Sequence, residues 1–170
     1  MNRYAEDANY WSTTVHPAKS QAEIIELFEE FGVGDTNIMQ GVTGGKYIWL
    51  IRFKWNDRSY RFVFTPLECK NPEKYFRVSN KNRSYEEQSR YQMGRIAAAF
   101  VKAILTAAET TPAALFGFLE LPSPKSGGLP PTAADLDISG IKSLLPDIGV
   151  SFHPQLSDGV NIEGSFREIS

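Results

Sequence analysis

Two segments that alternate between aromatic and other residues constrain the fold of this chain more than any other feature. They cover residues 46–55 and 58–65 and are separated by Asn56-Asp57, a dipeptide that favours a two-residue β-turn. With this turn as the loop, the register pairs Trp55 with Arg58, Phe53 with Tyr60, Ile51 with Phe62 and Trp49 with Phe64. The pattern therefore predicts an antiparallel hairpin with one aromatic, buried face.

The opposite face of this hairpin is cationic at one end. The same register places Arg52 directly opposite Arg61, with Lys54 two residues away on the same face. Like charges in directly opposed positions destabilise a sheet. We therefore expect either an acidic neighbour within the fold or an anionic ligand outside it.

Further periodic segments flank the hairpin. Residues 36–43 are typical of a third strand, joined to the hairpin through Gly44-Gly45. Ser20 with Glu23, and Ser84 with Glu87, have the spacing of helix capping boxes. The predicted helices cover residues 20–31, 84–108 and 113–119. The fold class expected is α+β, with a three-stranded antiparallel meander packed against two or three helices.

The predicted domain organisation follows from composition. We expect an N-terminal arm at 1–19, a core domain at 20–121, a linker rich in Pro and Gly at 122–132, and a C-terminal extension at 133–170 that begins with a further helix over 133–145. The chain of 170 residues is 42% hydrophobic, which is typical of one globular domain.

The sequence has no apolar stretch near the roughly 20 residues that cross a bilayer, and its N-terminus lacks the apolar core of a signal peptide. Cys69 is the only cysteine, so no intrachain disulfide can form. We expect a cytoplasmic protein without membrane association. His16 and His153 lie far apart in the sequence, and we expect neither a structural metal nor a cofactor.

The net charge of −2 conceals three charge blocks. Residues 46–102 carry 13 basic and 5 acidic residues, whereas residues 1–45 carry 2 and 7, and residues 103–170 carry 3 and 8. A block with a charge of +8 is typical of a nucleic-acid or phosphate partner, although a fold can also pair it with its own acidic flanks.

Residues 66–83 have the composition of a long loop in which cations alternate with aromatic residues. Lys and Arg side chains would neutralise phosphates, and the aromatic rings would stack on unpaired bases or pin the loop to the core. The candidate nucleic-acid-binding residues are Arg52, Lys54, Arg61, Lys70, Lys74, Tyr75, Phe76, Arg77, Lys81, Arg83, Arg90 and Arg95.

Two segments resemble catalytic motifs. Glu68-Cys69-Lys70, with Asp57 or an acidic residue of the helix at 20–31, resembles the acidic-x-lysine core of Mg²⁺-dependent nucleases of the restriction-like type. A phosphate-binding loop at 41–46 would need a glycine at Gln40 and a Ser or Thr at Tyr47, so we expect a hairpin turn there. No catalytic residues are assigned.

The helix that reads EQSRYQMGRI from Glu87 to Ile96, preceded by the aromatic meander and followed by LFGFL at 115–119, resembles a group of short uncharacterised proteins of phages and mobile elements. The resemblance covers about residues 18–121 and implies an accessory protein of such an origin. We expect a non-enzymatic protein that binds nucleic acid through its basic central face. The alternatives are a small interaction protein that binds a host protein, or forms a homo-oligomer, or sequesters a nucleotide, and a Mg²⁺-dependent nuclease.

Overall fold

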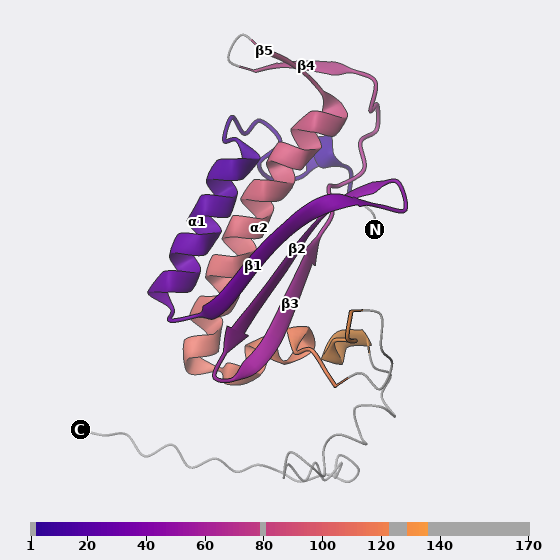
Figure 1. The fold of residues 1–170 in the computed structure, drawn as a ribbon. Coiled ribbons are helices and arrows are strands. Elements are labelled where there is room, and N and C mark those ends of the chain that lie inside the picture. Colours follow the sequence, from indigo (N-terminus) through magenta and orange to yellow (C-terminus); the bar gives the residue numbers. More distant parts are fainter. Residues whose placement is uncertain (1–2, 79–80, 123–128, 136–170) are drawn as a thin grey trace, which may run out of the picture. The chain divides into compact units, whose positions relative to one another are not determined.

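The computed structural model describes residues 3–78, 81–122 and 129–135 (Figure 1). It has an α+β fold in which a three-stranded antiparallel sheet of order β1-β2-β3 is packed on one face by helices. A second, two-stranded sheet lies beyond the start of the longer helix (Figure 1). The elements are α1 (Pro17–Glu30), β1 (Gly34–Thr43), β2 (Lys46–Trp55), β3 (Arg58–Phe64), β4 (Tyr75–Val78), β5 (Lys81–Ser84), α2 (Tyr85–Thr110) and the 3₁₀ helices η1 (Ala5–Asp7), η2 (Pro112–Phe118) and η3 (Ala133–Asp135).

The predicted meander and its register are confirmed. The β2–β3 pairing runs from Trp55 opposite Arg58 to Trp49 opposite Phe64. Asn56 and Asp57 have φ angles of 49° and 60°, which are those of the turn type that matches strand twist in a two-residue hairpin. Gly44 and Gly45 form the equivalent turn between β1 and β2.

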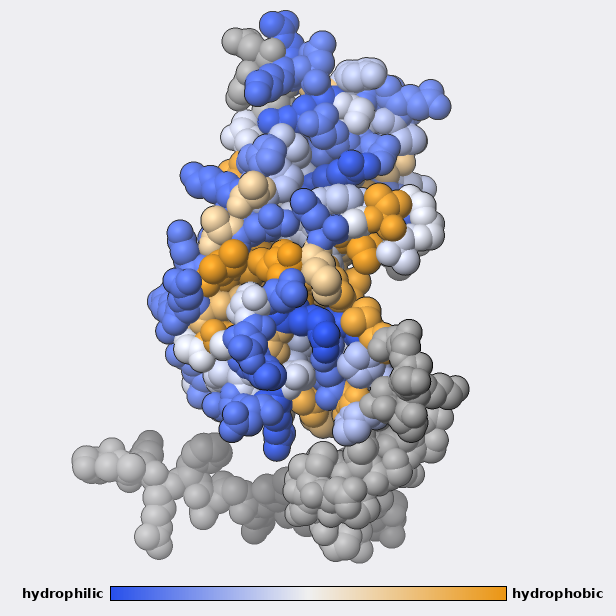
Figure 2. Space-filling view, in the orientation of Figure 1, coloured by the Kyte–Doolittle hydropathy of each residue, from blue (hydrophilic) through white to orange (hydrophobic). Residues whose placement is uncertain are grey.

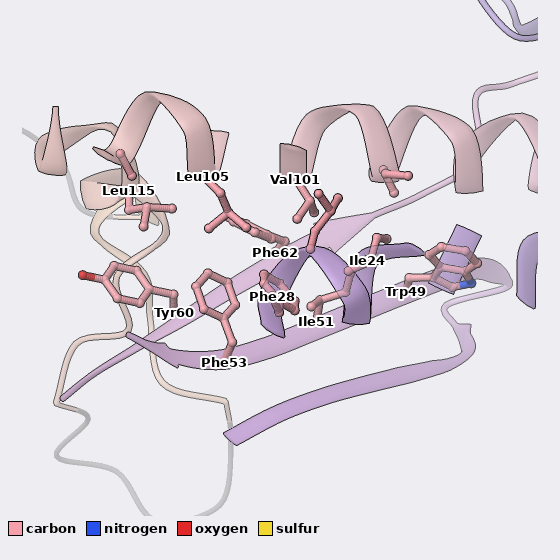
Figure 3. Close-up of a cluster of buried hydrophobic side chains, with 14 of the residues drawn as sticks. Ile24, Phe28, Trp49, Ile51, Phe53, Tyr60, Phe62, Val101, Leu105 and Leu115 are labelled. Atoms are coloured by element: carbon pink, nitrogen blue, oxygen red, sulfur yellow. The ribbon is translucent and has the colours of Figure 1, made fainter. Parts of the chain in front are cut away.

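The aromatic face of the meander packs against α1 and α2 (Figure 3). Trp49, Ile51, Phe53 and Phe62 are at most 2% exposed, and they contact a stripe of small and aliphatic residues on α2. At an order of 1.5–3 kcal/mol for each large side chain removed from water, the burial of these four side chains is a major stabilising contribution to the fold.

The start of α1 differs from the prediction. The helix begins at Pro17, and the His16 side chain caps it by accepting a hydrogen bond from the Ala18 N–H. Ser20 is buried inside the helix instead of capping it. Proline is favoured at the first helical position because its missing N–H would have no partner there, so the chain enters the helix three residues earlier.

The capping box at the start of α2 forms in part, because the Ser84 hydroxyl accepts a hydrogen bond from the Glu87 N–H. Two amide side chains of the next turns, Gln88 and Gln92, are fully buried. Gln92 donates to the carbonyls of Ala5 and Asn9, at 2.9 and 2.8 Å. These bonds fix the irregular N-terminal segment against α2, because each buried carbonyl needs a donor.

The prediction that residues 66–83 form a loop is wrong for the second half of that segment. Residues 75–84 form the hairpin β4–β5, with Tyr75 opposite Ser84 and Phe76 opposite Arg83. The alternation of this segment was obscured because charged side chains occupy both of its faces.

After η2, the chain returns across the open edge of β3. Leu119 forms a bridge with Tyr60, and the Glu120 N–H donates to the Ser59 carbonyl at 2.9 Å. Of the helix predicted over 133–145, η3 covers the first three residues, and the remainder lies outside the described residues, as does most of the linker. No helix in the described part of the chain is long and apolar enough to span a membrane.

Candidate nucleic-acid interface

The Arg52/Arg61 pair has an acidic partner within the fold. Glu120 accepts both arms of the Arg52 guanidinium, at 2.9 and 2.6 Å, and lies 3.9 Å from Arg61. Its side chain is 4% exposed, and its presence raises the pKa of Arg52 further above its usual value. Arg61 also donates to the Pro130 carbonyl and lies 3.6 Å from Asp135. The cationic end of the sheet is therefore compensated by the segment that follows η2.

Four more of the predicted cations form ion pairs with carboxylates of the same chain. Three of them join α2 to α1, β2 to β1, and the segment after β3 to η1, and the fourth lies within α2. The pairs are Lys54 with Asp35, Lys70 with Asp7, Arg90 with Glu86, and Arg95 with Glu23. Exposed pairs contribute little to stability, but each one reduces the positive potential available to a ligand.

Arg83 is buried and has a structural role. Its guanidinium lies 3.7 Å from the centre of the Tyr91 ring, a cation–π geometry, and donates to the Gln88 side chain at 3.1 Å. The side chain is 8% exposed, so it has no open surface of the size that a phosphate needs.

The β4–β5 hairpin is anchored by the aromatic residues of one face. Phe76 packs against Trp11 and Tyr85, with ring centres 5.7 and 6.4 Å apart. Trp11 and Tyr85 themselves meet edge to face at 5.0 Å. Phe76 and Tyr85 therefore pin the ribbon to the N-terminal segment and the start of α2.

The other face of the hairpin is open. Tyr75 is 73% exposed and shares this face with Arg77, because side chains two residues apart in a strand point the same way. Lys74 at the base of the ribbon is exposed as well. Lys81 near the tip is also exposed, although its register position puts it on the same face as Phe76 and Arg83. Among the described residues, neither these two lysines nor Arg77 has a carboxylate within 4.0 Å. We call Lys74, Tyr75, Arg77 and Lys81 the ribbon cluster; Figure 2 shows that hydrophilic side chains dominate this end of the molecule.

An open pocket of about 490 Å³ lies between the N-terminal segment, the β1–β2 turn and the first turns of α2. Arg3, Tyr4, Tyr47 and Arg90 contribute to its lining. Cys69 lies in the same wall, where its thiol contacts the Tyr85 carbonyl at 3.3 Å. Burial raises the pKa of Cys69, so the thiol is protonated at neutral pH and is a poor nucleophile.

The residues of the nuclease alternative do not come together. Asp57 precedes β3 and Glu68 follows it, so the seven residues of the strand place them about 20 Å apart or more. Lys70 is paired with Asp7, and Glu23 with Arg95. Within the described ranges, no group of three or more His, Cys, Asp or Glu side chains is arranged to hold a metal ion.

The open face of the ribbon also carries Asn82, opposite Arg77, which the sequence reasoning did not select. The sequence feature that could have indicated a hairpin here is the dipeptide Ser79-Asn80, because such residues favour a turn between two short strands.

Comparison of the chain with family models, with curated proteins and with solved structures finds no match.

Proposed function

We propose that this protein binds single-stranded nucleic acid through the ribbon cluster. The observation that carries the proposal is the combination of an open aromatic ring with three exposed cations, Arg77 on the same face of the hairpin, Lys81 near its tip and Lys74 at its base, which have no carboxylate partner among the described residues. Cations contribute phosphate neutralisation, and an exposed ring stacks on an unpaired base whatever its identity. The binding is non-enzymatic.

The ribbon cluster is a small part of the basic face that the sequence predicts. Six of the predicted binding cations interact within the fold instead. Arg83 stacks on Tyr91, and five others form ion pairs with carboxylates of the same chain: Arg52, Lys54, Arg61, Lys70 and Arg95. A narrow two-stranded ribbon can also enter the major groove of a duplex. The exposed Tyr75 favours the single strand, since bases inside a duplex offer no free face for stacking.

The test is fluorescence anisotropy with labelled single-stranded DNA, RNA and duplex DNA at low and physiological salt. The variant Arg77→Ala/Lys81→Ala should weaken single-strand binding and make its salt dependence shallower by about one to two released ions. The matched control is Arg58→Ala/Lys102→Ala, which removes two exposed cations from other parts of the fold. Equal losses in both double variants, or stronger binding to duplex, would refute the proposal.

The pocket beside Arg90 supports a second candidate, the capture of a small nucleotide. Its lining combines cations with two tyrosine rings, although Arg90 is already paired with Glu86. Calorimetry with mononucleotides separates the two functions, because pocket binding would be lost in Tyr4→Ala and unchanged in Arg77→Ala/Lys81→Ala. An origin in a phage or mobile element remains part of the proposal.

A further inference from the structure

The two edges of the main sheet differ in how they are protected. At β3, residues Leu119 and Glu120 pair with the backbone of Tyr60 and Ser59 and cover part of the edge. At β1, the described residues provide no such partner. An uncovered edge presents a row of N–H and C=O groups to any extended chain, and proteins usually block such an edge with lysine, proline or a cover.

The backbone groups that β1 presents at this edge can be identified from the turn. Thr43 and Lys46 flank the two-residue turn and therefore exchange both of their hydrogen bonds. The backbone N–H and C=O groups of successive residues in a strand point to opposite sides. Those of Gly41 and Met39 therefore also bond to β2, whereas those of Val42, Gln40 and Ile38 point outward. No hydrogen bond joins the outward backbone groups to another described residue.

Beyond Asp35 and the irregularity at the start of β1, the strand carries none of the usual protection. Residues 36–43 contain no charged residue and no proline, and the only irregularity of the strand lies before Asn37. Val42 is 68% exposed and Met39 is 41% exposed. A strand that is long, neutral and partly apolar at an open edge is suited to pairing with another strand.

We propose that two copies of this chain pair through β1, in antiparallel orientation about a twofold axis at Gln40. This register overlaps residues 37–43 of the two copies and places Ile38 opposite Val42 of the second copy. It also places Met39 opposite Gly41 of the second copy. A Cβ built on Gly41 meets nothing within 4 Å, so there is space above this glycine for the methionine side chain. The two sheets become one continuous sheet, and the same patch serves both copies, as a twofold interface requires.

Pairing of two copies through β1 is a property separate from nucleic-acid binding, and it can be measured without nucleic acid. Light scattering after size exclusion, with the full chain at increasing concentration, should reach twice the chain mass of 19.1 kDa. Val42→Lys should return the mass to that of one chain, because it introduces charge beside Ile38 of the second copy. Val63→Lys is the matched control, since Val63 is 55% exposed on the other edge strand. Circular dichroism should show that both variants are folded.

Amide hydrogen exchange provides a second readout within a single protein. In the dimer, the N–H groups of Ile38, Gln40 and Val42 should be protected, and dilution or Val42→Lys should remove that protection. The N–H groups of Met39 and Gly41 should remain protected, because they bond to β2. A chain that stays monomeric at high concentration would overturn the proposal. So would a dimer that survives Val42→Lys, or one that Val63→Lys disrupts instead.

Discussion

Buried side-chain amides hold the N-terminal segment in place. Gln88 and Gln92 are fully buried on α2, and their NH₂ groups donate to backbone carbonyls of residues 5–13. From sequence they belong to a polar half of the helix, which a solvent-facing position would explain equally well. Their burial depends on carbonyls more than 70 residues away, and for that reason helical periodicity does not reveal it.

We expect Gln92→Leu to lower the free energy of unfolding by about 1–2 kcal/mol, because it leaves the Asn9 carbonyl without its donor. Urea denaturation measures this difference. Gln21→Leu is the control, since the Gln21 amide makes one long contact of 3.4 Å at the surface, and its effect should stay within about 0.5 kcal/mol. Equal effects at both positions would contradict the anchoring role of Gln92.

Asp135 should contribute to the acid sensitivity of the fold. Hydrogen bonds from the Thr132 N–H and hydroxyl, and to a smaller extent the charge of Arg61, hold the pKa of Asp135 below its usual value. A lowered folded-state pKa stabilises the protein above the ordinary aspartate pKa, and this contribution is lost as the pH falls through the folded value.

Asp135→Asn should therefore flatten the loss of stability in that acid window. Thermal unfolding followed from neutral to acidic pH provides the measurement. Because Asp135 is largely exposed, the effect should shrink at high salt. An unchanged pH profile would show that the Thr132 contacts do not stabilise the carboxylate.

At the scale of elements, the sequence predicted what local pattern and turn chemistry determine. The meander has the predicted register because Asn56-Asp57 and Gly44-Gly45 each select a two-residue turn. The start of α1 and the β4–β5 hairpin were missed for different reasons. At α1, His16-Pro17 competes with Ser20 as the helix start, and at the hairpin charged residues on both faces conceal the strand alternation.

The candidate site was only partly predictable from the sequence, because it depends on contacts between distant residues. Sequence identifies which residues are basic, but the fold decides which of them have partners. Glu120 lies 68 residues from Arg52, and no local pattern connects the two. The separation of Tyr75 from Phe76, one exposed and one packed on Trp11, likewise follows from a strand direction that the sequence left undefined.

The close contact between α2 and its neighbours explains a glycine inside the helix. A Cβ on Gly94 would lie 3.1 Å from the Trp49 ring and 3.3 Å from Ser20. Gly94→Ala should therefore lower the free energy of unfolding by about 1 kcal/mol, since overpacking exceeds the gain in helix propensity. Ala103→Gly, at an exposed position of α2, reports propensity alone. A stabilised Gly94→Ala variant in urea denaturation would contradict this packing.

Two neighbouring aromatic residues of β4 should separate binding from stability. Tyr75→Ala should leave the melting temperature unchanged, because the ring is exposed, and should weaken single-strand binding by about 1–3 kcal/mol. Phe76→Ala should lower the melting temperature, because this ring packs against Trp11 and Tyr85. Tyr75→Phe should bind like the parent protein. A melting temperature that falls equally in both alanine variants would contradict this division.

At the scale of the whole molecule, the fold pairs part of the basic block with the acidic flanks. Six of the eight described ion pairs join a cation of residues 46–102 to a carboxylate of the acidic flanks. Among the described residues, the cations of the ribbon cluster have no such partner, and neither have Arg58 and Lys102, but the ribbon cluster also has the exposed ring of Tyr75. This contrast is the basis for placing the ligand at the hairpin instead of on the main sheet.

The most direct test of this assignment is amide NMR of the folded protein during titration with a short single-stranded oligonucleotide. The account predicts that chemical-shift changes concentrate in residues 74–84 and weaken with added salt, while the amides around Arg52 and Arg61 stay unchanged. Changes centred on Arg52, Arg61 and Glu120, or no changes at low salt, would contradict it.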